Sequence, residues 1–215
     1  MNQLKADAVW GMMRKHEHRA FHRFPVSDPM KTALLLVDIQ NDYFPGGRME
    51  LVGSPEAGRR AGELLSLFRK EKLPIFHIQH VAIRKDATFF LPGTTGVEIH
   101  ETVCPLPGET VVRKHFPNSF RNTELLPLLR DSGVHLLVVC GMMTHMCVDA
   151  TVRAAFDHGF ECVTVRDACA TKGLAFDGEE IPAGMVQGAF LAALATYSRI
   201  VSAGELAAQM GWPTA

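Results

Sequence analysis

Three residues have the side-chain types that nucleophilic catalysis needs. Cys147, in GMMTHMCVDAT, comes shortly after a buried apolar run and Gly141, so it lies in the opening turn of a predicted helix, where free N–H groups and the helix dipole favour a thiolate. Asp38, in LLLVDIQNDYF, ends another apolar run, where partial burial raises a carboxyl pKa and suits it to proton transfer. Lys114, in VVRKHFPNSF, follows a short predicted strand and carries a positive charge. A thiol, a proton acceptor and a cation are what attack on an amide carbon requires.

Each of these residues, taken alone, has a more ordinary interpretation. A free cysteine is often a buried space-filler, a carboxylate at the end of a strand is often solvated or caps a helix, and a lone lysine is usually a surface charge. We accept the packing interpretation for the other four cysteines, which are Cys104, Cys140, Cys162 and Cys169. The catalytic interpretation of Cys147 therefore depends on Asp38 and Lys114 lying beside it.

Alternating strands and helices are predicted to bring these residues together. Apolar runs indicate strands at 32–40, 74–81, 109–115, 135–141 and 161–169, and a short strand followed by a helix at 199–210. Helices are predicted at 54–72, at 123–133 with Thr123 as N-cap, at 144–159 and at 181–196. This alternation predicts a three-layer α/β/α domain with a doubly wound, mainly parallel six-stranded sheet, whose carboxyl edge carries the site.

The chain is predicted to form one domain, because a length of 215 residues rarely needs splitting. Residues 1–30 show no strong hydrophobic period, and we interpret them as an N-terminal arm outside a domain that spans 31–215. Residues 84–122 are rich in Gly, Pro and Thr. They should form long loops around the short strand, and long loops in a compact domain usually carry function.

Composition argues for a small-molecule enzyme. The chain has 22 basic and 23 acidic side chains and a net charge of -1, so we expect neither nucleic-acid nor membrane partners. No apolar run approaches the roughly 20 residues that cross a bilayer. The five cysteines are odd in number and lack CxxC spacing, and no secretory signal precedes them. We therefore expect a soluble protein of the reducing cytoplasm.

Three segments in order, DIQNDYF, RKHFPNSF and GMMTHMCVDATVRAAFDHG, resemble the signature segments of isochorismatase-like cysteine hydrolases. That superfamily includes nicotinamidases and N-carbamoylsarcosine amidase, and the resemblance covers about 32–202. It implies that Asp38 takes the thiol proton, that Lys114 lowers the thiol pKa, and that Cys147 forms a thioester after ammonia leaves. It also implies a cis peptide between Met142 and Met143, which would aim the N–H groups of Met143 and Cys147 at the oxyanion.

Two departures from the superfamily narrow the expected function. Members that act on vinyl ethers often lack the cysteine, so its retention favours cleavage of an amide or ureido C–N bond. Nicotinamidases carry a metal site that begins with an Asp-x-His pair, whereas FHIQHVAIRKD lacks that Asp. His77 and His80 straddle a strand end and point to opposite faces. We expect one to be packed and one to face solvent, with no metal and no cofactor, and His80 remains a candidate substrate contact.

Further candidate substrate contacts lie in the loops. The aromatic side chains suit a small, flat or apolar acyl group, although closing the loops over the core or packing a subunit interface would explain them equally well. The asparagines could orient an amide or cap turns, and Thr144 could brace the turn or act as an N-cap. These candidates are Asn41, Phe44, Phe90, His115, Phe116, Asn118, Phe120 and Thr144.

The sequence leaves three functional hypotheses. The leading one is a cofactor-independent cysteine amidohydrolase acting on a small amide-type molecule. The second is a metal-dependent nicotinamidase-type deamidase that uses His77 or His80. The third is a non-catalytic binding protein in which Cys147 serves only redox sensing. The resemblance also implies a homo-oligomer, either a dimer or a tetramer.

Overall fold

The computed structural model describes residues 31–212, so the predicted arm at 1–30 lies outside the described residues. Six parallel strands form the main sheet in the order β3-β2-β1-β4-β5-β8. The predicted α/β fold is confirmed. The strands are β1 (Thr32–Val37), β2 (Ile75–His80), β3 (Thr110–Lys114), β4 (Leu136–Met142), β5 (Glu161–Ala170) and β8 (Arg199–Val201).

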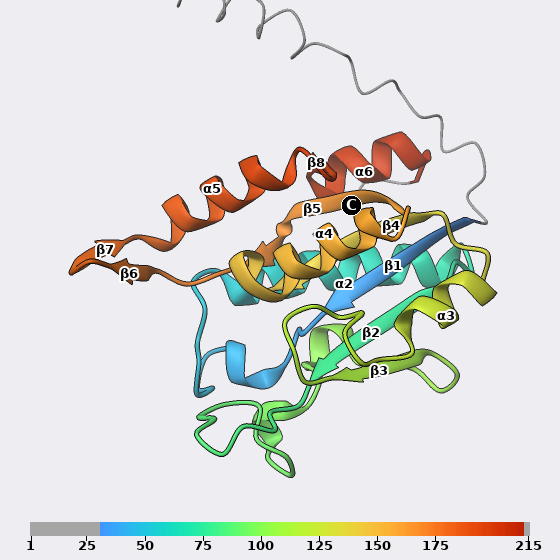
Figure 1. Ribbon diagram of the computed structural model, residues 1–215. Helices are drawn as coiled ribbons and strands as arrows, with labels where there is room; N and C mark the ends of the chain where they lie inside the picture. Colours follow the sequence, from blue (N-terminus) through green and yellow to red (C-terminus); the bar gives the residue numbers. More distant parts are fainter. Residues whose placement is uncertain (1–30, 213–215) are drawn as a thin grey trace, which may run out of the picture.

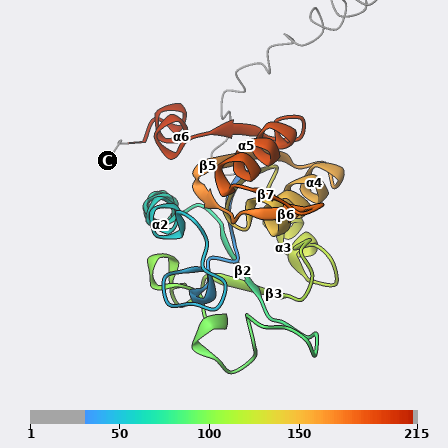
Figure 2. The ribbon, with the colours of Figure 1, turned by 90° about the vertical axis from the view of Figure 1, so that its left-hand side faces the viewer.

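The central strands are apolar because helices cover both faces of the sheet. Every residue of β1 is buried, and β1 pairs with β2 on one side and β4 on the other. Helices α2 (Ser54–Lys70) and α6 (Ala203–Met210) lie on one face. Helices α3 (Leu125–Asp131), α4 (Asp149–Asp157) and α5 (Ala183–Leu194) lie on the other, as Figure 2 shows.

Helix α2 shows how the sequence produces this layering. Its buried Ala57, Ala61, Leu64, Leu65 and Phe68 recur at helical spacing, so one stripe faces the sheet. The same helix exposes arginines and glutamates on its outer face. The hydrophobic core therefore lies between this stripe and the strands.

The chain reverses its direction of winding between β1 and β4. Successive strands run outward from β1 to β2 and β3, and then outward from β4 to β5 and β8. In doubly wound sheets, ligands bind at the carboxyl ends of the strands beside such a switch point. In Figure 1 the loops that follow β1 and β2 extend beyond this edge of the sheet.

Three details differ from the predicted elements. Helix α3 has Glu124 rather than Thr123 at its N-cap, although the Thr123 hydroxyl still accepts a hydrogen bond from the Leu125 N–H at 3.3 Å. The helix at 144–159 begins with a π-helical turn, Thr144–Val148, before α4. A small hairpin of β6 (Leu174–Phe176) and β7 (Glu179–Ile181) was not predicted.

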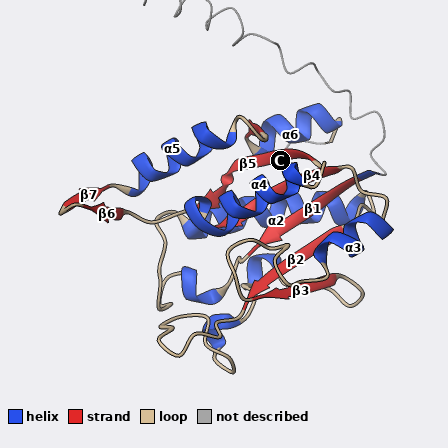
Figure 3. Ribbon diagram, viewed as in Figure 1, coloured by secondary structure: helices blue, strands red, loops and turns tan. Residues whose placement is uncertain are grey.

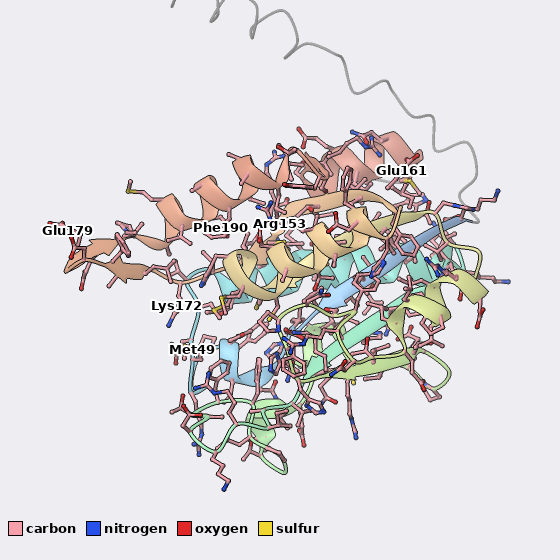
Figure 4. The ribbon with its side chains drawn as sticks, in the orientation of Figure 1. Met49, Arg153, Glu161, Lys172, Glu179 and Phe190 are labelled. Carbon is pink, nitrogen blue, oxygen red and sulfur yellow. The ribbon has the colours of Figure 1, made fainter. Side chains whose placement is uncertain are left out.

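The sequence of the hairpin explains why the turn between β6 and β7 forms. Asp177 and Gly178 both have positive φ, as an Asp-Gly pair adopts in a tight hairpin turn. Figure 3 shows the two short strands projecting together with α5, and Figure 4 labels Glu179 at the tip, away from the rest of the domain. Within residues 31–212, no helix is both long enough and apolar enough to span a bilayer.

Candidate active site

Asp38 lies directly after β1, where the chain leaves the sheet. Its φ is 51°, a left-handed conformation that aspartate tolerates better than most residues, and its N–H still donates to the Ile78 carbonyl at 3.1 Å. The side chain is completely buried. Neither carboxylate oxygen has a hydrogen-bond partner of good geometry among the described residues, so the carboxylate keeps the capacity to accept a proton.

Lys114, the last residue of β3, is also completely buried, and its Nζ lies 2.7 Å from Asp38 Oδ2. The ammonium donates to the carbonyls of Phe116 at 3.0 Å and Pro117 at 3.3 Å. Burial lowers the pKa of Lys114, but Asp38 and Cys147 outweigh burial, so the pKa is raised above its ordinary value. The site therefore holds a fixed positive charge at neutral pH.

Cys147 lies in the π-helical turn that follows β4, and the peptide bond between Met142 and Met143 is cis. The carbonyl of Met143 accepts hydrogen bonds from the N–H groups of Met146 at 3.0 Å and Val148 at 3.2 Å. Thr144 donates from its hydroxyl to the Ala170 carbonyl at 3.2 Å, which braces the turn against β5. A π-helical turn at this position is typical of functional sites.

Gly141 allows the turn to form so close to β1. Its φ is 132°, and a Cβ at this position would lie 2.0 Å from the carbonyl oxygen of Val37. Only glycine permits this approach. Because Val37 precedes Asp38, the same contact brings the nucleophile turn alongside the carboxylate.

The thiol itself is buried, with Cys147 only 4% exposed. Burial and the Asp38 carboxylate raise the pKa of Cys147 well above the ordinary thiol range, and the opposing effect of Lys114 is smaller. The sequence predicted that the helix position and Lys114 lower this pKa, whereas burial and Asp38 shift it in the opposite direction. The thiol is protonated at rest and lies beside a proton acceptor.

His80 completes the cluster from the end of β2. Its Nδ1 lies 3.1 Å from Lys114 Nζ, 3.9 Å from Asp38 Oδ2 and 4.0 Å from Cys147 Sγ. Burial lowers the pKa of His80 to about 4, with Lys114 and His115 acting in the same direction and Asp38 opposing them. The imidazole is therefore neutral at neutral pH.

The two histidines of β2 do not converge on a metal. His77 is buried, and its Nε2 lies 2.9 Å from Glu109 Oε2. Asp38, His80 and Cys147 do have metal-ligand spacing in the described part of the chain. The Lys114 ammonium, however, lies against both Asp38 and His80. A divalent cation there would face that positive charge, so the arrangement does not fit a resident metal.

The predicted lining residues fall into two groups. Phe90 is fully buried, and its ring centroid lies 5.8 Å from that of His80, so it stands next to the cluster. Phe116 contributes its carbonyl to Lys114, while the Arg121 guanidinium lies 3.8 Å from the centre of its ring. The exposed His115 bonds the Val81 carbonyl at 2.7 Å through Nδ1.

The other candidates make structural contacts instead. Phe44 stacks on His100, with ring centroids 3.5 Å apart. Asn41 donates to the Thr95 carbonyl at 2.8 Å, and Asn118 accepts from the Phe120 N–H at 2.8 Å. The Phe120 ring packs against His158 and Phe160. For these side chains the described contacts are those of packing and turn capping.

Sequence reasoning missed three residues of the DIQNDYF segment. Gln40 is buried and brackets the His80 backbone, accepting from its N–H at 2.7 Å and donating to its carbonyl at 2.9 Å. Asp42 accepts a hydrogen bond from the Phe90 N–H at 2.6 Å. The Tyr43 ring packs edge-on against Phe90. The signal was present, because polar residues inside a buried signature segment need partners.

The carboxyl edge of the sheet also joins distant segments. The Lys172 ammonium, just after β5, lies 3.6 Å from the Met49 sulfur in the loop that follows β1, and Figure 4 shows the two labelled side chains together. All five cysteines are free thiols, of which only Cys104 is exposed. The site is thus assembled entirely from loops and strand ends at one edge.

Comparison with known proteins places this geometry in a family. The chain matches the isochorismatase domain over residues 32–181. It is 55% identical to the isochorismatase family protein YddQ of Bacillus subtilis over 165 residues, which are 77% of this chain and 92% of that protein. It is 31% identical to maleamate amidohydrolase of Pseudomonas putida over 151 residues, 64% of this chain and 71% of that protein.

Solved structures agree with the sequence comparison. The crystal structure of an isochorismatase hydrolase from Oleispira antarctica superposes with a TM-score of 0.81 at 46% identity, covering 85% of this chain and 98% of that one. The family model, the sequence relatives and the superposed fold lead to one conclusion. The chain belongs to the isochorismatase family of hydrolases.

Proposed function

We propose that this protein hydrolyses a C–N bond of a small amide or ureido compound through a thioester on Cys147. The observation that carries the proposal is the buried cluster in which Lys114 Nζ lies 2.7 Å from Asp38 Oδ2 and the Cys147 sulfur lies within 4.8 Å of the Asp38 carboxylate. A carboxylate with free acceptor capacity stands beside that thiol. This arrangement supplies the proton acceptor that a buried thiol needs when it attacks.

The proposed reaction has two stages. Asp38 takes the proton of Cys147 as the sulfur bonds to the substrate carbonyl carbon. The tetrahedral intermediate collapses, the C–N bond breaks, and the protonated Asp38 returns that proton to the leaving nitrogen. Water then attacks the thioester, Asp38 accepts the water proton and gives it to the departing sulfur, and the acid is released.

The negative charge of each intermediate needs stabilisation on the carbonyl oxygen. We assign this role to the N–H groups of Met143 and Cys147, in the turn that follows the cis peptide. Lys114 holds the Asp38 carboxylate in place and offsets the negative charge that passes between Asp38 and Cys147. Its donors are directed to the carbonyls of Phe116 and Pro117 and to His80 Nδ1, so it acts as a fixed charge rather than as a proton donor.

Two considerations favour C–N over C–O cleavage. Cys147 is retained beside the Asp38 carboxylate, and a nucleophilic thiol suits acyl transfer. The similar maleamate amidohydrolase, by its name, hydrolyses the amide maleamate. The substrate of this chain therefore belongs, in our proposal, to small amides or ureido compounds.

The two alternatives are disfavoured by specific observations. A nicotinamidase-type metal enzyme needs ligands that converge, whereas His77 binds Glu109 and His80 faces Lys114. A redox sensor needs an accessible thiol of low pKa, and burial gives Cys147 the opposite properties. Chelation that abolished turnover would restore the metal alternative.

A screen with a matched variant tests the proposal. Wild type, Cys147→Ala and the control Cys104→Ala are compared on small amides, ureas and hydroxamates by ammonia or amine release. We expect Cys104→Ala to behave as wild type, because that thiol is exposed and is not one of the cluster residues. Cys147→Ala should lose on the order of 10⁴-fold or more in kcat. Full activity in folded Cys147→Ala protein would contradict the mechanism.

We also propose that the chain assembles with copies of itself. Large apolar side chains are exposed on α5, on the hairpin and at the isolated β-bridge between Val52 and Thr171: Met185 is 67% exposed, Phe176 78% and Val52 70%. Such surface is typical of an interface. Light scattering should give a multiple of the 23.7 kDa chain, and Phe176→Glu with Met185→Glu should reduce it. A monomeric wild type would contradict this assignment.

A further inference from the structure

His80 occupies a distinctive place in the cluster, because it is the member that reaches solvent. Its side chain is 19% exposed, whereas those of Asp38 and Lys114 are fully buried. A substrate that approaches Cys147 from solvent therefore meets the imidazole beside the thiol. The ring is 4.0 Å from the sulfur through Nδ1, so any bound acyl group lies within its reach.

The proton on this imidazole is placed by its neighbour. The Lys114 ammonium has donors only, and it lies 3.1 Å from His80 Nδ1, so Nδ1 must be the acceptor. The ring proton then resides on Nε2. Nε2 has no hydrogen-bond partner within residues 31–212, and Asp38 and Cys147 both face the Nδ1 side.

Buried neighbours fix the position of the His80 ring. Gln40, which is buried, bonds both the N–H and the carbonyl of His80, and its amide also donates to the Val97 carbonyl at 2.7 Å. The Phe90 ring packs beside the imidazole. A preorganised donor held by two backbone bonds and one ammonium is well suited to orienting a ligand.

We propose that His80 is a substrate-binding residue whose neutral Nε2–H donates to an acceptor oxygen on the substrate, next to the carbonyl that Cys147 attacks. This inference rests on the proposed function and deepens it. The preferred substrates are amides that carry a second carbonyl or carboxylate near the scissile group. Simple alkyl amides of the same length lack the acceptor and bind less tightly.

Two substitutions distinguish the roles of the two ring nitrogens of His80. In His80→Asn the amide oxygen can take the place of Nδ1 and accept from Lys114, but nothing replaces Nε2–H. In His80→Gln the longer amide can present its N–H near the Nε2 position, while the Nδ1 acceptor is lost. A purely structural role would make the shorter, better-fitting Asn the milder change.

The binding experiment uses full-length protein that does not turn over. Cys147→Ala protein with ¹⁵N-labelled histidine is titrated at pH 7 with malonamide, succinamide and, as the matched monoamide, butyramide. We expect His80 to show a protonated Nε2 and an unprotonated Nδ1, and the diamides to shift Nε2. Their affinity should exceed that of butyramide roughly tenfold, the worth of one hydrogen bond. Added to Cys147→Ala, His80→Asn should remove this preference and His80→Gln should retain it.

Several outcomes would overturn the inference. A protonated Nδ1, an imidazolium at pH 7, equal affinity for diamides and butyramide, or no shift of Nε2 at saturation would each do so. Failure of the proposed function has a separate signature, since it requires a folded Cys147→Ala protein that still hydrolyses amides. In an otherwise wild-type chain, His80→Asn should raise KM by roughly tenfold with little change in kcat, because the lost bond is made in the ground state as well.

Discussion

Two charge clusters, one partly exposed and one buried, lie on opposite faces of β2. On one face of β2, His77 meets Glu109 and Arg69, and on the other, His80 meets Asp38 and Lys114. In the first cluster the carboxylate is saturated: Glu109 accepts two bonds from Arg69, one from the Leu106 N–H and one from His77. In the second, the Asp38 carboxylate has an ion-pair partner but no hydrogen bond of good geometry from the described chain.

This difference in hydrogen bonding distinguishes a structural carboxylate, Glu109, from a catalytic one, Asp38. A saturated carboxylate has little capacity to accept another proton, and the pKa of Glu109 is lowered to about 2, mainly by Arg69. A buried carboxylate with free lone pairs costs stability and is kept where it performs chemistry. We therefore assign Glu109 to holding α2 against β3, and Asp38 to proton transfer.

The largest expected effect comes from removing the cation of the Asp38 cluster, and removing the cation of the Glu109 cluster is the matched comparison. Lys114→Met leaves the Asp38 charge buried and unpaired, so it should cost about 3–5 kcal/mol of unfolding free energy and abolish turnover. Arg69→Met removes a partly exposed partner and should cost about 1 kcal/mol with activity retained. Denaturant unfolding and amide hydrolysis measure both variants.

A double variant sharpens this result. Asp38→Asn combined with Lys114→Met removes both charges, so most of the lost stability should return while the protein remains inactive. If the double variant were no more stable than Lys114→Met, the unpaired Asp38 charge would not be the cause of the destabilisation.

Gly141 tests whether the nucleophile turn depends on its close approach to β1. Gly141→Ala places a Cβ against the Val37 carbonyl at a φ of 132° and should cost about 3 kcal/mol while displacing Cys147. Gly188→Ala, in α5 with open space around it, is the matched control and should be neutral or stabilising by up to about 1 kcal/mol. Similar unfolding curves for the two variants would contradict this account.

The smallest expected effect is the pH dependence of the stability that Glu109 contributes. Because its folded pKa is lowered from 4.5 to about 2, it contributes stability above pH 4.5 that is lost as the pH falls towards 2. Glu109→Gln should therefore lower Tm by a few degrees at neutral pH, and the difference from wild type should shrink through that window. Hydrolysis at neutral pH should be unchanged, in contrast to Asp38→Asn.

The fold and the three central residues were predictable because they depend on simple patterns. Continuous apolar runs marked β1 and β4, which precede Asp38 and the turn that carries Cys147, whereas Lys114 ends a short, partly exposed strand and stood out only through the resemblance to the superfamily. The direction of the Cys147 pKa shift was not predictable, since the helix position and the cation were visible in the sequence but the depth of burial was not.

Contacts between loops were equally hidden from the sequence. Phe44 and Phe120 look like pocket residues by type and position, yet their rings pack against His100 and Phe160. Gln40 stands out only as a polar residue inside an apolar segment, and the sequence does not show that its partner is His80, 40 residues away. The hairpin at 174–181 could have been found from its Asp-Gly pair.

The central claim is that Cys147 becomes acylated during turnover. The most direct measurement is intact-protein mass spectrometry of enzyme quenched in acid during hydrolysis of its best amide, followed by peptide mapping. We predict an added mass equal to the acyl group, carried by the peptide that contains Cys147 and absent from Cys147→Ala protein. Steady-state hydrolysis at saturating substrate with no acylated enzyme, and with no hydroxamate formed when hydroxylamine is added to trap a thioester, would contradict the account.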